Sequence, residues 1–143
     1  MKEKVGVTGA SGYLGLKLCD ELVKKGYAVK GLFNQIKPPL NIEGACWVQG
    51  NILRSQDVQE FIAGCDFVIH CAALISIAGD QKGKVWETNV VGTDNIISAC
   101  LQEKVKRLIY VSSTHAVKET PKNSPLDESR PYKDKNDFAY DYS

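Results

Sequence analysis

Three glycines near the N-terminus, spaced three residues apart, constrain the fold of this chain more than any other feature. Residues 5–7 before them are apolar and mostly β-branched, and the glycines are Gly9, Gly12 and Gly15. Leucines then recur every fourth residue, as one face of a helix requires: Leu14, Leu18 and Leu22. The pattern predicts a strand, a tight turn and a helix. Because the first N–H groups of a helix lack intrahelical partners, a diphosphate is the ligand that suits them best.

Each glycine has a physical role in such a turn. Gly9 would allow the turn itself, Gly12 would let the backbone approach phosphates, and Gly15 would let the helix pack against the strand. A tight turn without any ligand is the alternative. The preceding strand and the following helix favour a dinucleotide site, because such a glycine pattern indicates dinucleotide binding only when it lies between a strand and a helix.

Strand and helix patterns alternate along the rest of the chain. Strands are predicted at 27–33, 45–49, 66–70 and 107–112, and helices at 57–63 and 82–103. Ser55 or Gln56 is expected near the cap of the first of these helices. The alternation predicts a Rossmann-type α/β fold, a doubly wound parallel sheet with strand order 3-2-1-4-5.

Two of these elements carry predictions about burial. The strands at 66–70 and 107–112 are apolar at nearly every position, which is typical of strands covered on both faces. The helix at 82–103 has an apolar face that we expect to lie in the core or in a dimer contact. Its members are Trp86, Val90, Thr93, Ile97, and Cys100 or Leu101.

Composition excludes several classes of function. With 143 residues, 43% of them hydrophobic, and a net charge of +1, the chain predicts one soluble domain with no nucleic-acid or lipid surface. Its five cysteines form no CxxC pair, so we expect reduced thiols and no metal site. The apolar run at 67–78 is too short to span a bilayer, and the N-terminus lacks a signal peptide, so the expected location is the cytoplasm.

Several segments together resemble one protein family. Thr8-Gly9-x-x-Gly12-x-x-Gly15 is similar to the TGxxGxxG of the extended short-chain dehydrogenase/reductase superfamily, of the NAD-dependent epimerase/dehydratase type. Further segments resemble, in order, the family's GDL, HxAA, NVxGTxN and (Y/F)xSS(S/T): Gly50-Asn51-Ile52, His70-Cys71-Ala72-Ala73, residues 89–95 and Tyr110-Val111-Ser112-Ser113-Thr114. Within the superfamily, the sequence of these segments most resembles the dihydroflavonol reductase and 3β-hydroxysteroid dehydrogenase-like group.

The resemblance implies an NAD(P) site. The matching positions are Gly9, Ser11, Gly12, Tyr13, Leu14, Gly15, Asn34, Asn51, Ile52, Cys71, Ala72, Ala73 and Asn89. Asn34 lies where NAD-specific sites place an acid and NADP sites a cation. Because Lys30 and Lys37 flank it, charge gives a slight preference for NADP. Asn51 replaces the usual Asp and keeps a carbonyl acceptor for the adenine amine.

The resemblance also implies a catalytic Ser/Thr, Tyr and Lys, the last two spaced as YxxxK. Thr114 matches the hydroxyl residue, with Ser113 as second choice, and Tyr140 matches the tyrosine in preference to Tyr142. A phenol suits the reaction because hydride transfer to a carbonyl creates an alkoxide that must be protonated. A hydroxyl nearby can hold the carbonyl oxygen.

The family's lysine would be residue 144, so we expect a fragment with little activity of its own. Residues 1–143 would form a single NAD(P)-binding domain, truncated before the C-terminal strands and the substrate region, with 113–143 as a long loop and the start of the catalytic helix. His70 is expected in the core or at the ribose edge, His115 is a candidate substrate contact, and Cys71 is expected to be a packed side chain.

The function implied is an NAD(P)-dependent oxidoreductase, a ketone or secondary-alcohol reductase or dehydrogenase. A nucleotide-sugar epimerase or dehydratase shares every one of these motifs and stays open as the alternative. A protein that binds NAD(P)H without catalysis is a third. The expected partners are a small-molecule substrate and, through the helix at 82–103, a second copy of the chain.

Overall fold

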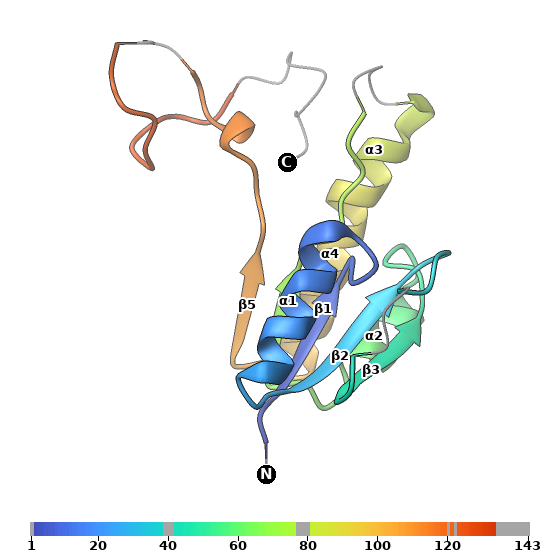
Figure 1. Ribbon diagram of the computed structural model, residues 1–143. Coiled ribbons are helices and arrows are strands. Elements are labelled where there is room, and N and C mark those ends of the chain that lie inside the picture. The colour runs from blue at the N-terminus through green and yellow to red at the C-terminus, as the bar shows by residue number, and fades with distance from the viewer. Residues whose placement is uncertain (1, 39–41, 77–80, 120, 122, 134–143) are drawn as a thin grey trace.

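Five parallel strands form one sheet in the order β3-β2-β1-β4-β5 (Figure 1). This computed structural model describes residues 2–38, 42–76, 81–119, 121 and 123–133. The strands are β1 (Lys4–Thr8), β2 (Ala28–Phe33), β3 (Ala45–Gln49), β4 (Phe67–His70) and β5 (Arg107–Tyr110). The predicted fold class and strand order are confirmed. Because the order reverses between β1 and β4, the sheet has its switch point there.

Helices cover both faces of the sheet. Helix α1 (Tyr13–Lys24) lies on one face, while α2 (Ser55–Ile62) and α4 (Gly92–Gln102) pack together on the other (Figure 1). A short 3-10 turn (Gln81–Gly83), α3 (Lys84–Trp86) and a π-helical turn (Glu87–Val91) lead into α4. The predicted cap of α2 is wrong: Ser55 is already helical, and Arg54 occupies the N-cap without a side-chain hydrogen bond.

The alternation of side chains along the strands divides the core into two parts. Val5 and Val7 of β1 point toward α1, where they pack with Cys19. On the other face, Val68 of β4 packs with residues of α2 and α4, among them Phe61 and Ile96. The sheet therefore contributes to both cores, as expected for a sheet between two helical layers. The face of α1 toward the sheet carries Gly15, Cys19 and Leu22, and Leu14 of the predicted stripe is exposed.

The predicted buried face of the 82–103 helix is correct at Cys100 and wrong at Trp86 and Ile97. Trp86, Ile97 and Leu101 are 43%, 40% and 75% exposed, and the buried positions are Val85, Gly92, Ile96, Ala99 and Cys100. The buried positions lie one residue before the predicted ones, and this offset is already present at Val85, ahead of the π-helical turn. The predicted stripe was therefore placed one residue too far along the helix, because the spacing of apolar residues alone does not fix which side of the helix faces the sheet. A core position for Trp86 is thus excluded, whereas a dimer contact stays a prediction.

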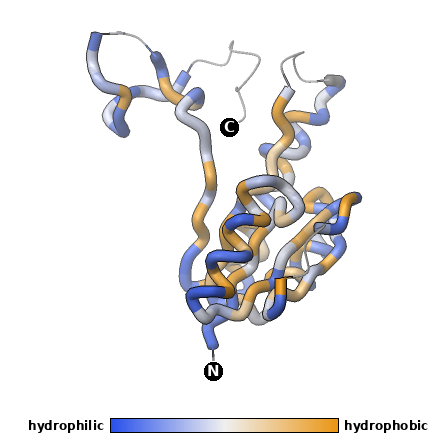
Figure 2. Tube along the Cα trace, viewed as in Figure 1, coloured by the Kyte–Doolittle hydropathy of each residue, from blue (hydrophilic) through white to orange (hydrophobic). Residues whose placement is uncertain are grey.

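Strand β5 is also more exposed than expected. It ends at Tyr110, and Ile109 and Tyr110 are 47% and 42% exposed. The hydropathy tube shows that β5, at one edge of the sheet, contains apolar residues (Figure 2). The reason is its place in the sheet, since β5 pairs only with β4 in the part of the chain that the structure describes.

The five cysteines are free thiols, and Cys19, Cys65 and Cys100 are buried. Among the described residues, no helix has the length and apolar character needed to cross a bilayer.

Two neighbouring isoleucines of α4 test the corrected face of this helix. Ile96 is fully buried and Ile97 is 40% exposed. Ile96→Ala should lower the free energy of unfolding by about 3 kcal/mol, because it leaves a cavity. Ile97→Ala should lower it by less than about 1 kcal/mol. Urea unfolding of both variants measures the difference, and equal losses would contradict the orientation of α4.

Candidate functional site

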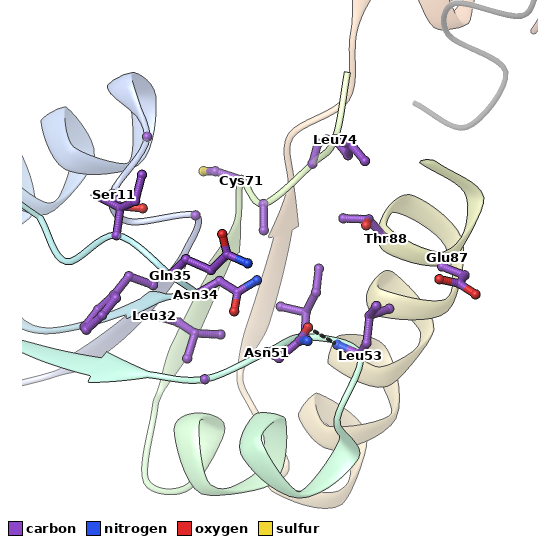
Figure 3. Close-up of a pocket in the computed structure, with 18 of the residues that line it drawn as sticks. Ser11, Leu32, Asn34, Gln35, Asn51, Leu53, Cys71, Leu74, Glu87 and Thr88 are labelled. Atoms are coloured by element: carbon purple, nitrogen blue, oxygen red, sulfur yellow. Dashed lines mark hydrogen bonds between the residues drawn. The ribbon is translucent and has the colours of Figure 1, made fainter. Parts of the chain in front are cut away.

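A cleft of about 640 Å³ opens at the carboxyl ends of the strands (Figure 3). Its walls come from the glycine turn, the segments that follow β2, β3 and β4, and the helix that precedes α4. The lining residues are Gly9, Ser11, Gly12, Leu32, Phe33, Asn34, Gln35, Ile36, Gly50, Asn51, Ile52, Leu53, Cys71, Ala72, Ala73, Leu74, Lys84, Glu87 and Thr88. The cleft thus spans the switch point, where open α/β sheets bind their ligands.

The glycine turn is closed by two backbone contacts that leave no room for side chains. Gly9 has φ +64°, and a Cβ there would lie 2.9 Å from the Cα and the amide nitrogen of Ala72. A Cβ on Gly15 would lie 2.2 Å from the Gly9 carbonyl oxygen. Gly15 therefore packs α1 against the turn, whereas we had expected it to pack the helix against the strand.

Helix α1 begins at this turn without a side-chain cap and without an acidic residue in its first turn. Its N-cap is Gly12, which has no side-chain acceptor to offer. The N–H groups of Tyr13, Leu14 and Gly15 occupy the positions that lack intrahelical acceptors. The side chain of Tyr13 is 97% exposed and stays clear of these groups. The helix therefore presents the partial positive charge and the donors that favour an anion.

The end of β2 carries amides instead of charges. Asn34 and Gln35 line the cleft, and the Gln49 side-chain amide donates to the Asn34 carbonyl at 3.1 Å. Lys30, expected to flank this end, instead donates through Nζ to the Glu60 carbonyl at 2.8 Å and lies over the Phe61 ring. The expectation for Lys30 is wrong because its position in β2 directs the side chain toward α2.

Asn51 is held by its own turn. Its Oδ1 accepts from the Leu53 amide at 3.0 Å (Figure 3), and its backbone N–H donates to the Asp57 carboxylate at 2.8 Å. The Leu53 contact fixes which side-chain atom is oxygen. One lone pair of the Asn51 Oδ1 atom, the acceptor expected for the adenine amine, is therefore already used. The side-chain NH₂ is a further group that could bind a ligand in the cleft.

His70 is a core residue, 1% exposed at the end of β4. Its Nδ1 lies 2.6 Å from the Thr8 hydroxyl, and its Nε2 lies 3.1 Å from the Thr93 hydroxyl. Burial lowers the pKa of the imidazole from 6.5 to about 4. His70 is thus neutral at pH 7 and does not line the cleft. Burial also raises the pKa of the Cys71 thiol, which suits a packed side chain better than a nucleophile.

Most of the expected cofactor positions meet in the cleft. Those that line it are Gly9, Ser11, Gly12, Asn34, Asn51, Ile52, Cys71, Ala72 and Ala73. Tyr13, Leu14, Gly15 and Asn89 are not part of this lining. Asn89 instead holds the backbone of Leu74, accepting from its N–H at 2.8 Å and donating to its carbonyl at 3.0 Å.

Sequence reasoning missed several lining residues. Gln35, Leu53 and Leu74 directly follow predicted positions, so a longer window at each strand end would have found them. Lys84 and Glu87, the charged members of the lining, precede the Asn89 motif and gave no signal. Thr88 adjoins Asn89 and belongs to the same turn.

Ser113 and Thr114, the expected catalytic residues that the structure describes, lie beyond β5, outside the cleft lining. The Ser113 hydroxyl accepts from the His115 amide at 3.2 Å, and Thr114 is exposed at the start of a 3-10 turn (Thr114–Ala116). The ring of His115 lies 3.3 Å from the Glu119 carboxylate. Tyr140 and Tyr142 lie outside the described residues, so their roles stay predictions.

The segment after this turn is more structured than the expected loop. Val117 and Tyr132 form an antiparallel bridge, and the Arg130 guanidinium donates to the carbonyls of Pro121, Ser124 and Pro125. The segment rises from the same carboxyl edge of the sheet as the cleft (Figure 1).

The buried imidazole predicts a pH dependence of stability. The unfolded chain protonates His70 near pH 6.5 and the folded chain only near pH 4, so the unfolded state binds more protons between these values. This residue's contribution to the unfolding free energy, about 3 kcal/mol, is therefore complete above pH 6.5 and is lost as the pH falls toward 4. We expect the unfolding free energy, measured by urea unfolding at several pH values, to rise more steeply with pH for the wild type than for His70→Gln. An equal dependence on pH in both proteins would refute the assignment.

Comparison with known proteins places the chain in a family. Residues 5–143 match the family described as NAD dependent epimerase/dehydratase. The chain is 33% identical over 126 residues to a 2-alkyl-3-oxoalkanoate reductase of Shewanella oneidensis, covering 88% of this chain and 32% of the relative. It is 32% identical over 136 residues to a 3-beta-hydroxysteroid dehydrogenase of Mycolicibacterium neoaurum, covering 90% and 37%. The chain thus spans about a third of the length of the curated relatives it matches.

Solved structures share the fold. The UDP-glucose 4-epimerase of Thermus thermophilus, in complex with NAD, superposes with a TM-score of 0.83 at 25% identity, covering 97% of this chain and 47% of that one. The expected resemblance is confirmed. The match over residues 5–143, together with the sheet order, shows that this chain belongs to the NAD dependent epimerase/dehydratase family of extended short-chain dehydrogenases/reductases.

Proposed function

We propose that this chain is the cofactor-binding portion of an NAD(P)-dependent oxidoreductase that interconverts a ketone and a secondary alcohol on a small-molecule substrate. The observation that supports it most strongly is the uncapped N-terminus of α1 beside the cleft at the switch point. Its reductase and dehydrogenase relatives at above 30% identity agree with this reading.

The cleft fits the cofactor on three counts. The diphosphate would lie on the N–H groups at the start of α1, where the glycine turn gives backbone access. The adenosine would lie between the amides that follow β2 and β3, namely Asn34, Gln35 and Asn51. The backbone of residues 71–74 would border the path toward β4. When bound, the nicotinamide supplies or accepts the hydride.

The remaining chemistry is assigned to hydroxyl groups after β5. Thr114, or Ser113 next to it, would donate a hydrogen bond to the substrate oxygen, and Tyr140 would pass the proton to or from that oxygen. Ser113 already accepts from the His115 amide, which leaves its hydroxyl proton free to be donated to a substrate.

A nucleotide-sugar epimerase or dehydratase is the second candidate, supported by the similarity to UDP-glucose 4-epimerase. The two candidates share the cofactor cleft, and they differ in what the enzyme does with the reduced cofactor. A reductase exchanges NAD(P)H with solvent in every cycle, whereas an epimerase returns the hydride to the same substrate.

We also propose NADP as the preferred cofactor. Of the residues after β2 that the structure describes, none that lines the cleft is acidic, so a 2′-phosphate would meet the neutral side chains of Asn34 and Gln35 without repulsion. The preference is expected to be small, because Lys30 is engaged with Glu60 and contributes no charge there.

The close contact at Gly15 provides a test of the cofactor site. In Gly15→Ala, the new methyl group would lie 2.2 Å from the Gly9 carbonyl oxygen. The carbonyl must therefore move, which shifts the turn that would hold the diphosphate. Calorimetry should show that NADP(H) and NAD(H) bind the wild type and bind this variant at least about ten-fold more weakly, a difference of about 1.4 kcal/mol.

Ile96→Ala is the matched control, because it loses stability in the core on the opposite face of the sheet. Its cofactor affinity should stay within about three-fold of the wild type, a difference of less than about 1 kcal/mol. Unchanged affinity in Gly15→Ala, or no binding by the wild type at millimolar concentration, would contradict the proposed site.

Asn34 provides a test of the preference. Asn34→Asp places a carboxylate where the 2′-phosphate would lie, so NADP binding should weaken by about ten-fold relative to NAD. The ratio of the two dissociation constants, measured on wild type and variant, is the readout. Gln49→Ala, which removes only the hydrogen bond to the Asn34 carbonyl, should leave the ratio within about two-fold. An unchanged ratio in Asn34→Asp would place the ribose elsewhere.

A further inference from the structure

A polar network that is buried at Thr8 and His70 and half-buried at Asn89 and Thr93 connects β1, the loop after β4 and the π-helical turn. It contains Thr8, His70, Thr93 and Asn89, none of which contributes a side chain to the cleft lining. Thr8 and His70 are both at most 1% exposed. The network therefore lies directly behind the cleft.

The hydrogens of this network can be assigned in one way. Thr93 donates its hydroxyl proton to the Asn89 carbonyl at 2.6 Å, so its oxygen must accept from the His70 Nε2–H at 3.1 Å. The Nδ1 atom of the neutral ring then carries no proton and accepts from the Thr8 hydroxyl at 2.6 Å. All three hydrogen bonds point in one direction, an arrangement in which each bond polarises the next.

The two ends of this network hold the loop that borders the cleft. The Thr8 oxygen accepts from the amides of Cys71 and Ala72, both at 3.1 Å. At the other end, the Asn89 side chain holds both the N–H and the carbonyl of Leu74. Thr8 and Asn89, the residues that hold the backbone of residues 71–74, are thus connected through His70, Thr93 and the Asn89 backbone carbonyl.

We propose that His70 is a positioning residue for cofactor binding: as the Nε2–H tautomer it joins Thr8 to Thr93 and so fixes the backbone of residues 71–74 along the cleft. This inference rests on the proposed function for its ligand. The Nδ1–H tautomer would break the hydrogen bond between His70 and Thr8, because its proton would face a Thr8 oxygen that already accepts two hydrogen bonds.

Thr93 allows a test that leaves His70 in place. Thr93→Val keeps the shape of the side chain but removes the acceptor of the Nε2–H, whereas Thr93→Ser keeps the hydroxyl and serves as the matched control. In Thr93→Val, amide hydrogen exchange at Cys71, Ala72 and Leu74 should accelerate by about ten-fold, while Phe61 in α2 stays unchanged. NADP(H) affinity, measured by calorimetry, should fall by a similar factor. Thr93→Ser should match the wild type in both.

The outcomes separate this inference from the proposed function. Exchange in Thr93→Val that equals the wild type would overturn the positioning role, and so would faster exchange with undiminished cofactor affinity. If the wild type binds no cofactor, the proposed function fails, and loop exchange alone decides the positioning role. If Thr93→Val does not fold, ¹⁵N spectra of the wild-type imidazole decide: an unprotonated Nδ1 with a protonated Nε2 supports the assignment, and the reverse overturns it.

Discussion

The structure depends on one crowded point, where the turn after β1 touches α1 and the loop after β4 at once. The Gly9 backbone lies against Ala72, and the Gly15 backbone lies against the Gly9 carbonyl, so neither contact tolerates a methyl group. The contact of Gly9 with Ala72 joins the two halves of the sheet across the switch point, and the contact of Gly15 with Gly9 holds α1 on the turn. They also aim the first turn of α1 at the cleft, which is why the position of the cleft follows from the same residues that fix the fold.

Around this point the polar groups are arranged in two layers. Backbone N–H groups and the amides Asn34, Gln35 and Asn51 are available to a ligand. Behind them, Thr8 and His70 satisfy each other and the amides of the following loop, and both side chains are shielded from solvent. A buried network of this kind is favourable only when every member is paired, so it holds one geometry and resists others.

The sequence was sufficient to predict what depends on local pattern. The strand order, the turn and the family followed from glycine spacing and from alternating helix and strand periods. Burial on β5 and α4 did not follow, because it depends on which elements lie beside these residues in the folded chain. Asn51 lines the cleft as expected and Lys30 does not flank it. The hydrogen bonds that hold their side chains, to Leu53 and Glu60, form only once the chain has folded. The roles of Thr114 and Tyr140 stay predictions.

The most direct test of the central claim is a titration of the ¹⁵N-labelled chain with NADP(H), followed through the backbone amide spectrum. Binding at the glycine turn predicts that the largest shifts occur at Tyr13, Leu14 and Gly15, with smaller ones after β2 and β3. Shifts confined to the segment beyond β5, or none at saturating cofactor, would show that this turn is structural and holds no diphosphate.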